Sequence, residues 1–104
     1  MAERTIMLVC NAGMSTSILV TNMKKVATRD NKDYEIFAVS TSKVPEMVAN
    51  KNIDAILLGP QIRYMESKIK EQAKGIPLEV INMTDYGTMN GENVITQAER
   101  LFNR

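Results

Sequence analysis

Cys10 is the only cysteine in this sequence of 104 residues, and a loop rich in small and hydroxyl side chains follows it directly. An apolar segment, Thr5–Val9, leads into the thiol, and an amphipathic pattern begins at about Ser15. The thiol is therefore expected at the carboxyl end of a strand and beside the amino end of a helix. Free backbone N–H groups and the positive end of the helix dipole meet at such a place, which favours a thiolate and binds phosphoryl groups.

The residues after Cys10 supply donors for a phosphoryl group. Gly13 lets the backbone approach an anion closely, and Ser15, Thr16 and Ser17 offer hydroxyls, one of which is expected to cap the helix. Phosphoryl transfer depends more on positioning and charge stabilisation than on acid–base catalysis. A buried structural cysteine and hydroxyls that only cap the helix are the plainer alternatives. The expected nucleophile is Cys10, and the expected phosphate-binding loop is Asn11, Ala12, Gly13, Met14, Ser15, Thr16 and Ser17.

The loop lacks features of cysteine-dependent enzymes with a similar layout. Low-molecular-mass cysteine phosphatases have a Cys-x5-Arg loop, and Thr16 stands at the position of that arginine. Without a guanidinium group, the transition state of hydrolysis is harder to stabilise. Arsenate reductases of similar fold use additional cysteines, which this sequence lacks. A cysteine that accepts a phosphoryl group without the usual means of hydrolysing it suits a carrier. A small cysteine-dependent phosphatase and a non-catalytic anion-binding module are the alternatives.

Composition narrows the other possibilities. The 13 Lys and Arg residues nearly balance the 12 Asp and Glu residues, and the net charge of +1 argues against a nucleic-acid partner. The absence of histidine argues against a transition-metal site, and no cofactor is expected. No segment approaches the ~20 apolar residues of a membrane span, and no signal peptide is visible. One unpaired cysteine fits a reducing cytoplasm. We expect a single cytoplasmic domain over residues 1–104.

Strands and helices alternate along the sequence. The expected strands are Thr5–Val9, Tyr34–Val39, Asp54–Leu58 and Pro77–Ile81. The expected helices cover about 15–28, a short segment that begins near Ser42, the segment from Gly59-Pro60 to about Lys74, and Asn93–Phe102. Thr41 or Ser42 is expected to cap the short helix, and Gly75 to end the third.

Helical spacing indicates the inward faces of these helices. The first helix is expected to bury Ile18, Leu19, Met23 and Val26, and the third to bury Ile62, Met65, Ile69 and Ala73.

This alternation predicts an α/β fold of three layers, with a four-stranded parallel sheet and helices on both faces, similar to low-molecular-mass cysteine phosphatases. The first and third strands are almost entirely apolar and suit the centre, while Glu35 and Glu79 suit edge strands. The expected strand order is 2-1-3-4, with right-handed crossovers. Ligands bind where the order reverses, at the carboxyl ends of the strands. Cys10 is expected there.

Residues after the third and fourth strands should reach the same edge. Gln61 and Tyr64 follow the third strand, and Tyr86 follows the fourth. We expect these three to contact a partner or to support the loop, although ordinary roles in helix initiation and packing are open alternatives.

Three segments in order resemble a known family. The segment 10–17 is similar to the phosphocysteine loop of the enzyme IIB component of the bacterial sugar phosphotransferase system, lactose/cellobiose type. The segments Leu57–Ile62 with Tyr64-Met65, and Val80-Ile81 with Tyr86-Gly87, are similar to two further family segments. The similarity covers nearly the whole chain and is close to the cellobiose or N,N′-diacetylchitobiose branch. Asn11 departs from the family pattern, since a small residue is more usual there.

The resemblance implies a phosphoryl carrier with two partners. Such proteins accept a phosphoryl group from a histidine of the IIA protein, hold it on the cysteine that matches Cys10, and pass it to a sugar bound by the membrane component IIC. A β-disaccharide of the cellobiose or chitobiose kind is the implied acceptor. The chain alone is expected to be a monomer, docked transiently at the inner face of the membrane.

Overall fold

Four parallel strands form one sheet in the computed structural model, which describes residues 3–11 and 14–103. The sheet order is β2-β1-β3-β4, as the sequence predicts. The strands are β1 (Arg4–Cys10), β2 (Tyr34–Ser40), β3 (Ala55–Leu58) and β4 (Leu78–Val80). The chain reverses its winding between β1 and β3, so the carboxyl ends of these two strands form the topological switch point.

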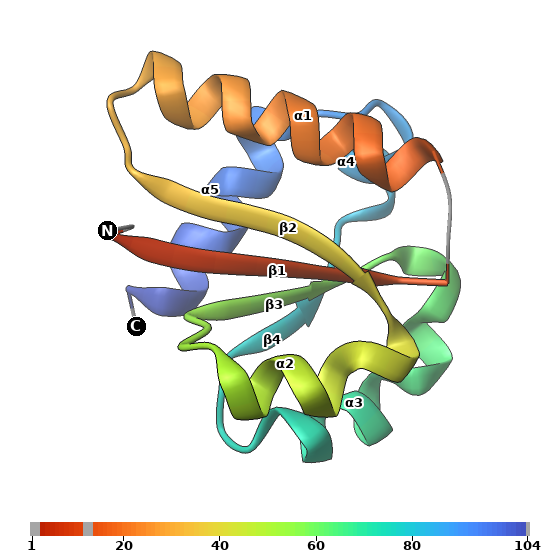
Figure 1. The fold of residues 1–104 in the computed structure, drawn as a ribbon. Coiled ribbons are helices and arrows are strands. Elements are labelled where there is room, and N and C mark those ends of the chain that lie inside the picture. The colour runs from red at the N-terminus through yellow and green to blue at the C-terminus, as the bar shows by residue number, and fades with distance from the viewer. Residues whose placement is uncertain (1–2, 12–13, 104) are drawn as a thin grey trace.

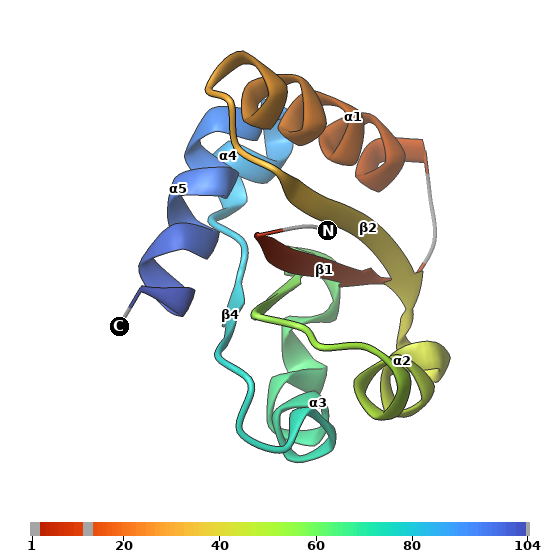
Figure 2. The same cartoon turned by 60° about the vertical axis from the view of Figure 1, so that its left-hand side comes forward.

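Helices cover both faces of the sheet, which confirms the three-layer prediction (Figure 1). One face carries α1 (Met14–Arg29), α4 (Met83–Gly87) and α5 (Gly91–Phe102), and Figure 2 shows these three on one side of the strands. The other face carries η1 (Thr41–Lys43), α2 (Val44–Asn50), η2 (Pro60–Met65) and α3 (Glu66–Ala73). None of the helices in the described ranges has the length and apolar character that crossing a bilayer requires.

Strand β1 divides the core into two halves because successive side chains of a strand point to opposite faces. Ile6 and Leu8 belong to the cluster shared with α1 and α5, and Met7 and Val9 belong to the cluster shared with α2 and α3. All four are fully buried. Cys10 continues the alternation of Ile6 and Leu8, so its side chain lies on the face that carries α1, α4 and α5.

The buried face of α1 differs from the expected one. Ile18 is 48% exposed, whereas Leu19 and Met23 are fully buried and Thr16 and Ala27 nearly so. Neighbouring helical residues are about 100° apart, and the line formed by these four buried residues faces the sheet and α5. The prediction that Ile18 faces the core is therefore wrong.

Two expected helix caps are also wrong. Ser15, Thr16 and Ser17 lie inside α1, which begins at Met14, so none of them is its N-cap. Thr41 and Ser42 lie inside η1 and do not cap α2, whose N-cap position is occupied by Lys43 without a side-chain hydrogen bond. The Ser42 hydroxyl instead lies 3.1 Å from that of Ser40. The fixed φ of Pro45 in the first turn of α2 is pre-organised for a helix, so the turn does not depend on a cap.

The third helical segment contains a kink and has the expected end. Ile62 has non-helical dihedral angles within η2, and α3 follows as a separate helix. Lys74 takes a left-handed conformation with φ of 52°, and Gly75 follows with φ of 93°. Glycine adopts such angles without steric cost, so Gly75 fits the helix end that the sequence predicts.

Helices α1 and α5 approach each other closely at Gly91. A Cβ atom built on Gly91 would lie 2.7 Å from the carbonyl carbon of Asn22 and 2.8 Å from the amide nitrogen of Met23. Both are backbone atoms of α1, which a side-chain rotation does not move. Gly91 therefore sets the distance between the two helices that cover the Cys10 face of the sheet.

We expect Gly91→Ala to lower the free energy of unfolding by about 1–3 kcal/mol, because the added methyl group overpacks a helix contact. Urea unfolding followed by circular dichroism measures the change. Gly87→Ala is the matched control, since a Cβ at Gly87 would meet no atom within 4 Å. Equal stability of the two variants would show that the helices have room to separate at no cost.

Candidate functional site

Cys10 is the last residue of β1 and lies between the ends of two neighbouring strands. Its register partner in β2 is Ser40. On the other side, the Gly59 N–H donates a hydrogen bond to the Val9 carbonyl (2.9 Å), and a Cβ built on Gly59 would lie 3.6 Å from the Cys10 Cβ. The thiol residue is 8% exposed. The turn after β3 thus packs directly against the cysteine.

A small hollow of about 230 Å³ opens beside Cys10. Cys10, Asn11, Thr16, Ser17, Ala38, Val39 and Ser40 line it. These side chains include hydroxyls and an amide, and no charged group is among them. The hollow therefore offers neutral hydrogen-bonding groups beside a thiol.

A buried hydrogen bond joins the start of α1 to α4. The hydroxyl oxygens of Thr16 and Tyr86 are 2.9 Å apart, across 70 residues of sequence. Both residues are buried, with exposed fractions of 2% for Thr16 and 8% for Tyr86. A buried bond of this kind is costly to break because one partner is left unsatisfied. It holds the first turn of α1, next to Cys10, to the segment that follows β4.

Helix α4 positions Tyr86 although it has only five residues. The Asn82 side chain caps it by accepting a hydrogen bond from the Asp85 N–H (3.1 Å). The Asp85 carboxylate in turn accepts from the Asn93 side-chain amide (2.9 Å), which ties α4 to α5. These contacts hold the backbone of the helix that carries Tyr86. Helix α4 is absent from the predicted elements because it is too short for a periodic pattern, and its weak local signal is Asn82 followed by an acidic residue three positions later.

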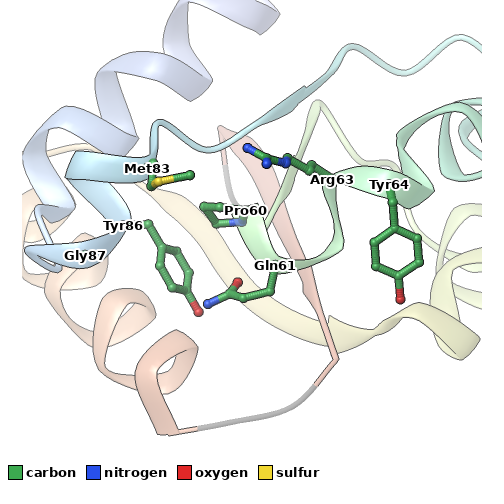
Figure 3. Close-up of a pocket in the computed structure, with 7 residues that line it drawn as sticks. All are labelled: Pro60, Gln61, Arg63, Tyr64, Met83, Tyr86 and Gly87. Carbon is green, nitrogen blue, oxygen red and sulfur yellow. The ribbon is translucent and has the colours of Figure 1, made fainter.

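An open apolar pocket of about 470 Å³ lies beyond Tyr86 (Figure 3). Pro60, Gln61, Arg63, Tyr64, Met83, Tyr86 and Gly87 line it. Tyr64 is 75% exposed and Met83 is 62% exposed. Together with Ile18, they are the large hydrophobic side chains that the structure, over its described residues, leaves exposed. The sequence predicts Gln61, Tyr64 and Tyr86 at this edge of the sheet. It does not predict Arg63 and Met83, because no motif or spacing distinguishes them from ordinary surface residues.

Gln61 and Tyr86 face each other across this pocket. In the view of Figure 3 their polar ends point toward each other. The Gln61 Oε1 lies 2.9 Å from the position that a Cβ of Gly59 would occupy. The Gln61 side chain therefore lies against the turn that packs on Cys10.

Several of the expected loop residues lie together beside Cys10, and others are not among the described residues. Asn11 is exposed and lines the hollow with Thr16 and Ser17. The expected contributions of Ala12 and Gly13 lie outside the described residues, as do those of the side chains of Met14 and Ser15. Helix α1 already includes Met14. Thr16 and Ser17 are therefore helical residues beside the thiol.

Charged contacts concentrate at the opposite end of the strands. Tyr34, at the start of β2, donates a hydrogen bond to the Glu99 carboxylate (2.7 Å), which also pairs with Lys32. Burial and this hydrogen bond raise the pKa of Tyr34 above its ordinary value. The hydrogen bond to Glu99 likewise raises the pKa of Lys32. Within the described ranges, no group of three or more His, Cys, Asp or Glu side chains could hold a metal ion.

Comparison with known proteins gives the family of the chain. The family model of the phosphotransferase-system (PTS) lactose/cellobiose-specific IIB subunit matches residues 5–97. The chain therefore belongs to this family, whose members are phosphotransferase components of sugar transport. The resemblance that the three sequence segments predict is confirmed.

Curated relatives span almost the whole chain. The galactose-specific EIIB component of Lactococcus lactis subsp. cremoris and the cellobiose-specific EIIB component of Lactococcus lactis subsp. lactis are each 46% identical, over 99% of this chain and 100% of the relative. The oligo-β-mannoside-specific EIIB component of Bacillus subtilis is 39% identical, over 95% of this chain and 96% of its own length.

Solved structures have the same fold. A cellobiose-specific phosphotransferase IIB component from Borrelia burgdorferi is 44% identical, with a TM-score of 0.80 over 96% of this chain and 92% of that structure. The lactose-specific IIB domain from Streptococcus pneumoniae is 15% identical and has a TM-score of 0.81, over 96% and 98% of the two chains. At that identity, the lactose-specific structure supports the fold alone.

We expect Asn82→Ala to lower the free energy of unfolding by about 0.5–2 kcal/mol, because α4 loses its N-cap. Asn82→Asp is the matched control, since its carboxylate also accepts a hydrogen bond from the Asp85 N–H. Amide hydrogen exchange at residues 83–87 should be faster in Asn82→Ala than in Asn82→Asp. The same exchange rates in both variants would mean that the contacts with α5, and not the cap, hold α4.

Proposed function

We propose that this protein is the phosphoryl carrier of a sugar phosphotransferase system and that Cys10 carries the phosphoryl group. In the first step, the Cys10 thiolate attacks the phosphorus of a phosphohistidine on the IIA protein. The S–P bond forms, the N–P bond breaks, and the electron pair of the broken bond returns to the imidazole nitrogen. The phosphoryl group then lies in the hollow beside Cys10.

In the second step, the phosphoryl group passes to a sugar bound by the membrane component IIC. A sugar hydroxyl oxygen attacks the phosphorus, the O–P bond forms, and the S–P bond breaks with its electron pair on the sulfur. The hydroxyl proton leaves to solvent, and the thiolate is regenerated. This step places the protein in the cytoplasm, with transient docking at the inner face of the membrane.

The position of Cys10 is the observation that carries the proposal. The cysteine ends β1 at the switch point of a parallel sheet, four residues before the start of α1. Backbone N–H groups at the amino end of a 16-residue helix favour an anion. We propose that Asn11, Ala12, Gly13, Met14, Ser15, Thr16 and Ser17 form the phosphate-binding loop. Membership of a IIB family supports transfer in preference to hydrolysis.

The acceptor we propose is a β-disaccharide of the cellobiose or chitobiose kind. Two relatives with the same 46% identity bear the names of galactose and cellobiose. Sequence identity of this chain therefore does not discriminate between these sugars. The cellobiose-specific neighbour and the relative specific for oligo-β-mannosides favour a β-linked sugar.

We propose that the IIA protein docks over the apolar pocket beside the hollow. Tyr64 and Met83 expose large apolar surfaces there. Of the other lining residues, Gln61 lies against the Gly59 turn, and Tyr86 is hydrogen-bonded to Thr16, which lines the hollow. A partner that covers this pocket also excludes water from the thiol during transfer, which protects the phosphoryl group from hydrolysis. The interface is modest, as transient partners require, and the chain acts as one monomeric domain.

We expect the wild-type protein to gain one phosphoryl group, about 80 Da, when it is incubated with phosphorylated IIA, and we expect Cys10→Ser to gain none. Intact-mass spectrometry at neutral pH measures the adduct, and peptide mapping assigns it to Cys10. Circular dichroism controls for folding. Rapid hydrolysis of an aryl phosphate without IIA would instead favour a cysteine phosphatase. If the wild-type protein neither gains a phosphoryl group nor hydrolyses the aryl phosphate, a non-catalytic anion-binding module is the remaining function.

We expect Tyr64→Ala to slow phosphoryl transfer from IIA roughly fivefold or more at limiting IIA, because an exposed aromatic anchor at an interface is lost. The rate at saturating IIA should change little. Quenched-flow measurement of the phosphorylated fraction at several IIA concentrations separates the rate at limiting IIA from the rate at saturating IIA. Arg100→Ala, an exposed residue near the carboxyl end of α5, is the control. An unchanged rate for Tyr64→Ala would place the IIA interface elsewhere.

A further inference from the structure

The hydrogen bond between Thr16 and Tyr86 has a preferred direction. Either hydroxyl is a possible donor at 2.9 Å. A phenol is much more acidic than an aliphatic hydroxyl, so it is the better donor, and the aliphatic oxygen is the better acceptor. On this ground Tyr86 is the expected donor and Thr16 the expected acceptor. The proton of the Thr16 hydroxyl is then directed away from Tyr86, and the described residues offer it no other hydrogen-bond acceptor.

The hollow beside Cys10 is the place where that second acceptor can lie. Thr16 lines the hollow together with Cys10, although its residue is only 2% exposed. Among the described residues, Tyr86 is the side-chain partner of the Thr16 hydroxyl. An anion on the Cys10 sulfur would therefore lie in a hollow that Thr16 helps to line, within reach of a rotation of its O–H proton.

We propose that Tyr86 is a positioning residue that orients the Thr16 hydroxyl to donate a hydrogen bond to the phosphoryl group on Cys10. The proposal rests on the proposed function, because it requires a phosphocysteine. Tyr86 acts through Thr16 and does not touch the phosphoryl group itself. Chained hydrogen bonds polarise one another, so donation by Tyr86 also makes Thr16 a stronger donor.

The rigid setting of both residues makes this arrangement effective. Thr16 belongs to the first turn of α1, and Tyr86 is fixed by α4 with its Asn82 cap. The Thr16 hydroxyl is thus oriented before the phosphoryl group arrives, and less conformational freedom is lost on transfer. An unoriented threonine would have to give up a rotamer or another hydrogen bond at that moment.

The decisive variant is Tyr86→Phe, which removes the hydroxyl and keeps the ring in its place. With phosphorylated IIA present, we expect the equilibrium constant for phosphoryl transfer to this protein to fall roughly threefold to tenfold. Phosphorus NMR gives a second readout. Loss of an oriented donor should raise the pKa of the phosphocysteine group, because hydrogen bonds to the charged form favour that form.

Tyr34→Phe is the matched control for the loss of a tyrosine hydroxyl. Tyr34 also donates a hydrogen bond within the fold, to Glu99 at 2.7 Å, but it lies at the opposite end of the strands. This variant should lose stability without a change in the transfer equilibrium or in the phosphorus titration. Thermal unfolding of both variants separates a general loss of stability from an effect at Cys10.

Thr16 variants complete the test as a double-mutant cycle. We expect Thr16→Val to reduce the transfer equilibrium at least as much as Tyr86→Phe, and Thr16→Ser to retain most of it. In the Thr16→Val background, Tyr86→Phe should have no further effect, since the hydroxyl that it orients is gone. If Tyr86→Phe fails to fold, the comparison of Thr16→Val with Thr16→Ser still tests the donor.

Three results would overturn the proposal. They are an unchanged transfer equilibrium and phosphorus titration in folded Tyr86→Phe, equal phosphoryl uptake by Thr16→Val and Thr16→Ser, or additive effects of the two sites. In each case, the carrier function would still stand if the wild-type protein is phosphorylated on Cys10. If the wild-type protein never carries phosphorus on Cys10, both the carrier function and the role of Tyr86 are overturned.

Discussion

The direction of the Cys10 side chain depends on the register of β1 between its two neighbours. At the amino end, the Thr5 N–H donates to the Asp54 carboxylate (2.7 Å), and the Asp54 N–H donates to the Thr5 carbonyl (2.9 Å). At the carboxyl end, Gly59 donates to Val9 (2.9 Å). A slip of one residue would exchange the two faces of the strand. The thiol would then lie on the side of α2 and α3, away from α1 and Tyr86. Register is thus the constraint on which the site depends.

The site combines parts that are distant in sequence because parallel strands present their carboxyl ends at one edge. Cys10 ends β1, Gln61 follows β3, and Tyr86 follows β4. Each arrives on a short, tightly held segment. The hydrogen bond from Gly59 to Val9 holds the β3 turn against Cys10, and the missing Cβ of Gly59 leaves room for the Gln61 side chain. The Thr16–Tyr86 hydrogen bond joins the start of α1 to α4. The charged pairs around Glu99 lie at the other end, where they stabilise the fold without adding negative charge beside the thiol.

The sequence predicts the sheet order, the long helices and the location of Cys10, because alternating apolar segments and one unpaired thiol are strong local signals. It does not predict α4, since five residues are too short for a periodic pattern and are held by Asn82 and Asn93. The exposure of Ile18 depends on how α1 is rotated against α5, and the close contact at Gly91 is part of that packing. The Thr16–Tyr86 bond joins residues 70 positions apart, which no local pattern reveals. Tertiary contacts therefore decide the details of the site.

A carrier must bind the phosphoryl group well enough to accept it and weakly enough to release it. A bidentate guanidinium at the position of Thr16 would stabilise the phosphoryl group and, more strongly, the charge that spreads in a transition state. Water could then serve as acceptor as readily as a sugar. Neutral hydroxyls and backbone N–H groups stabilise a charged acceptor in separate increments, each of about 1.5–3 kcal/mol, without a cation. The hollow beside Cys10 has no charged lining residue. A Thr16 hydroxyl oriented by Tyr86 supplies directional stabilisation without a positive charge, which is the balance that transfer between two partners requires.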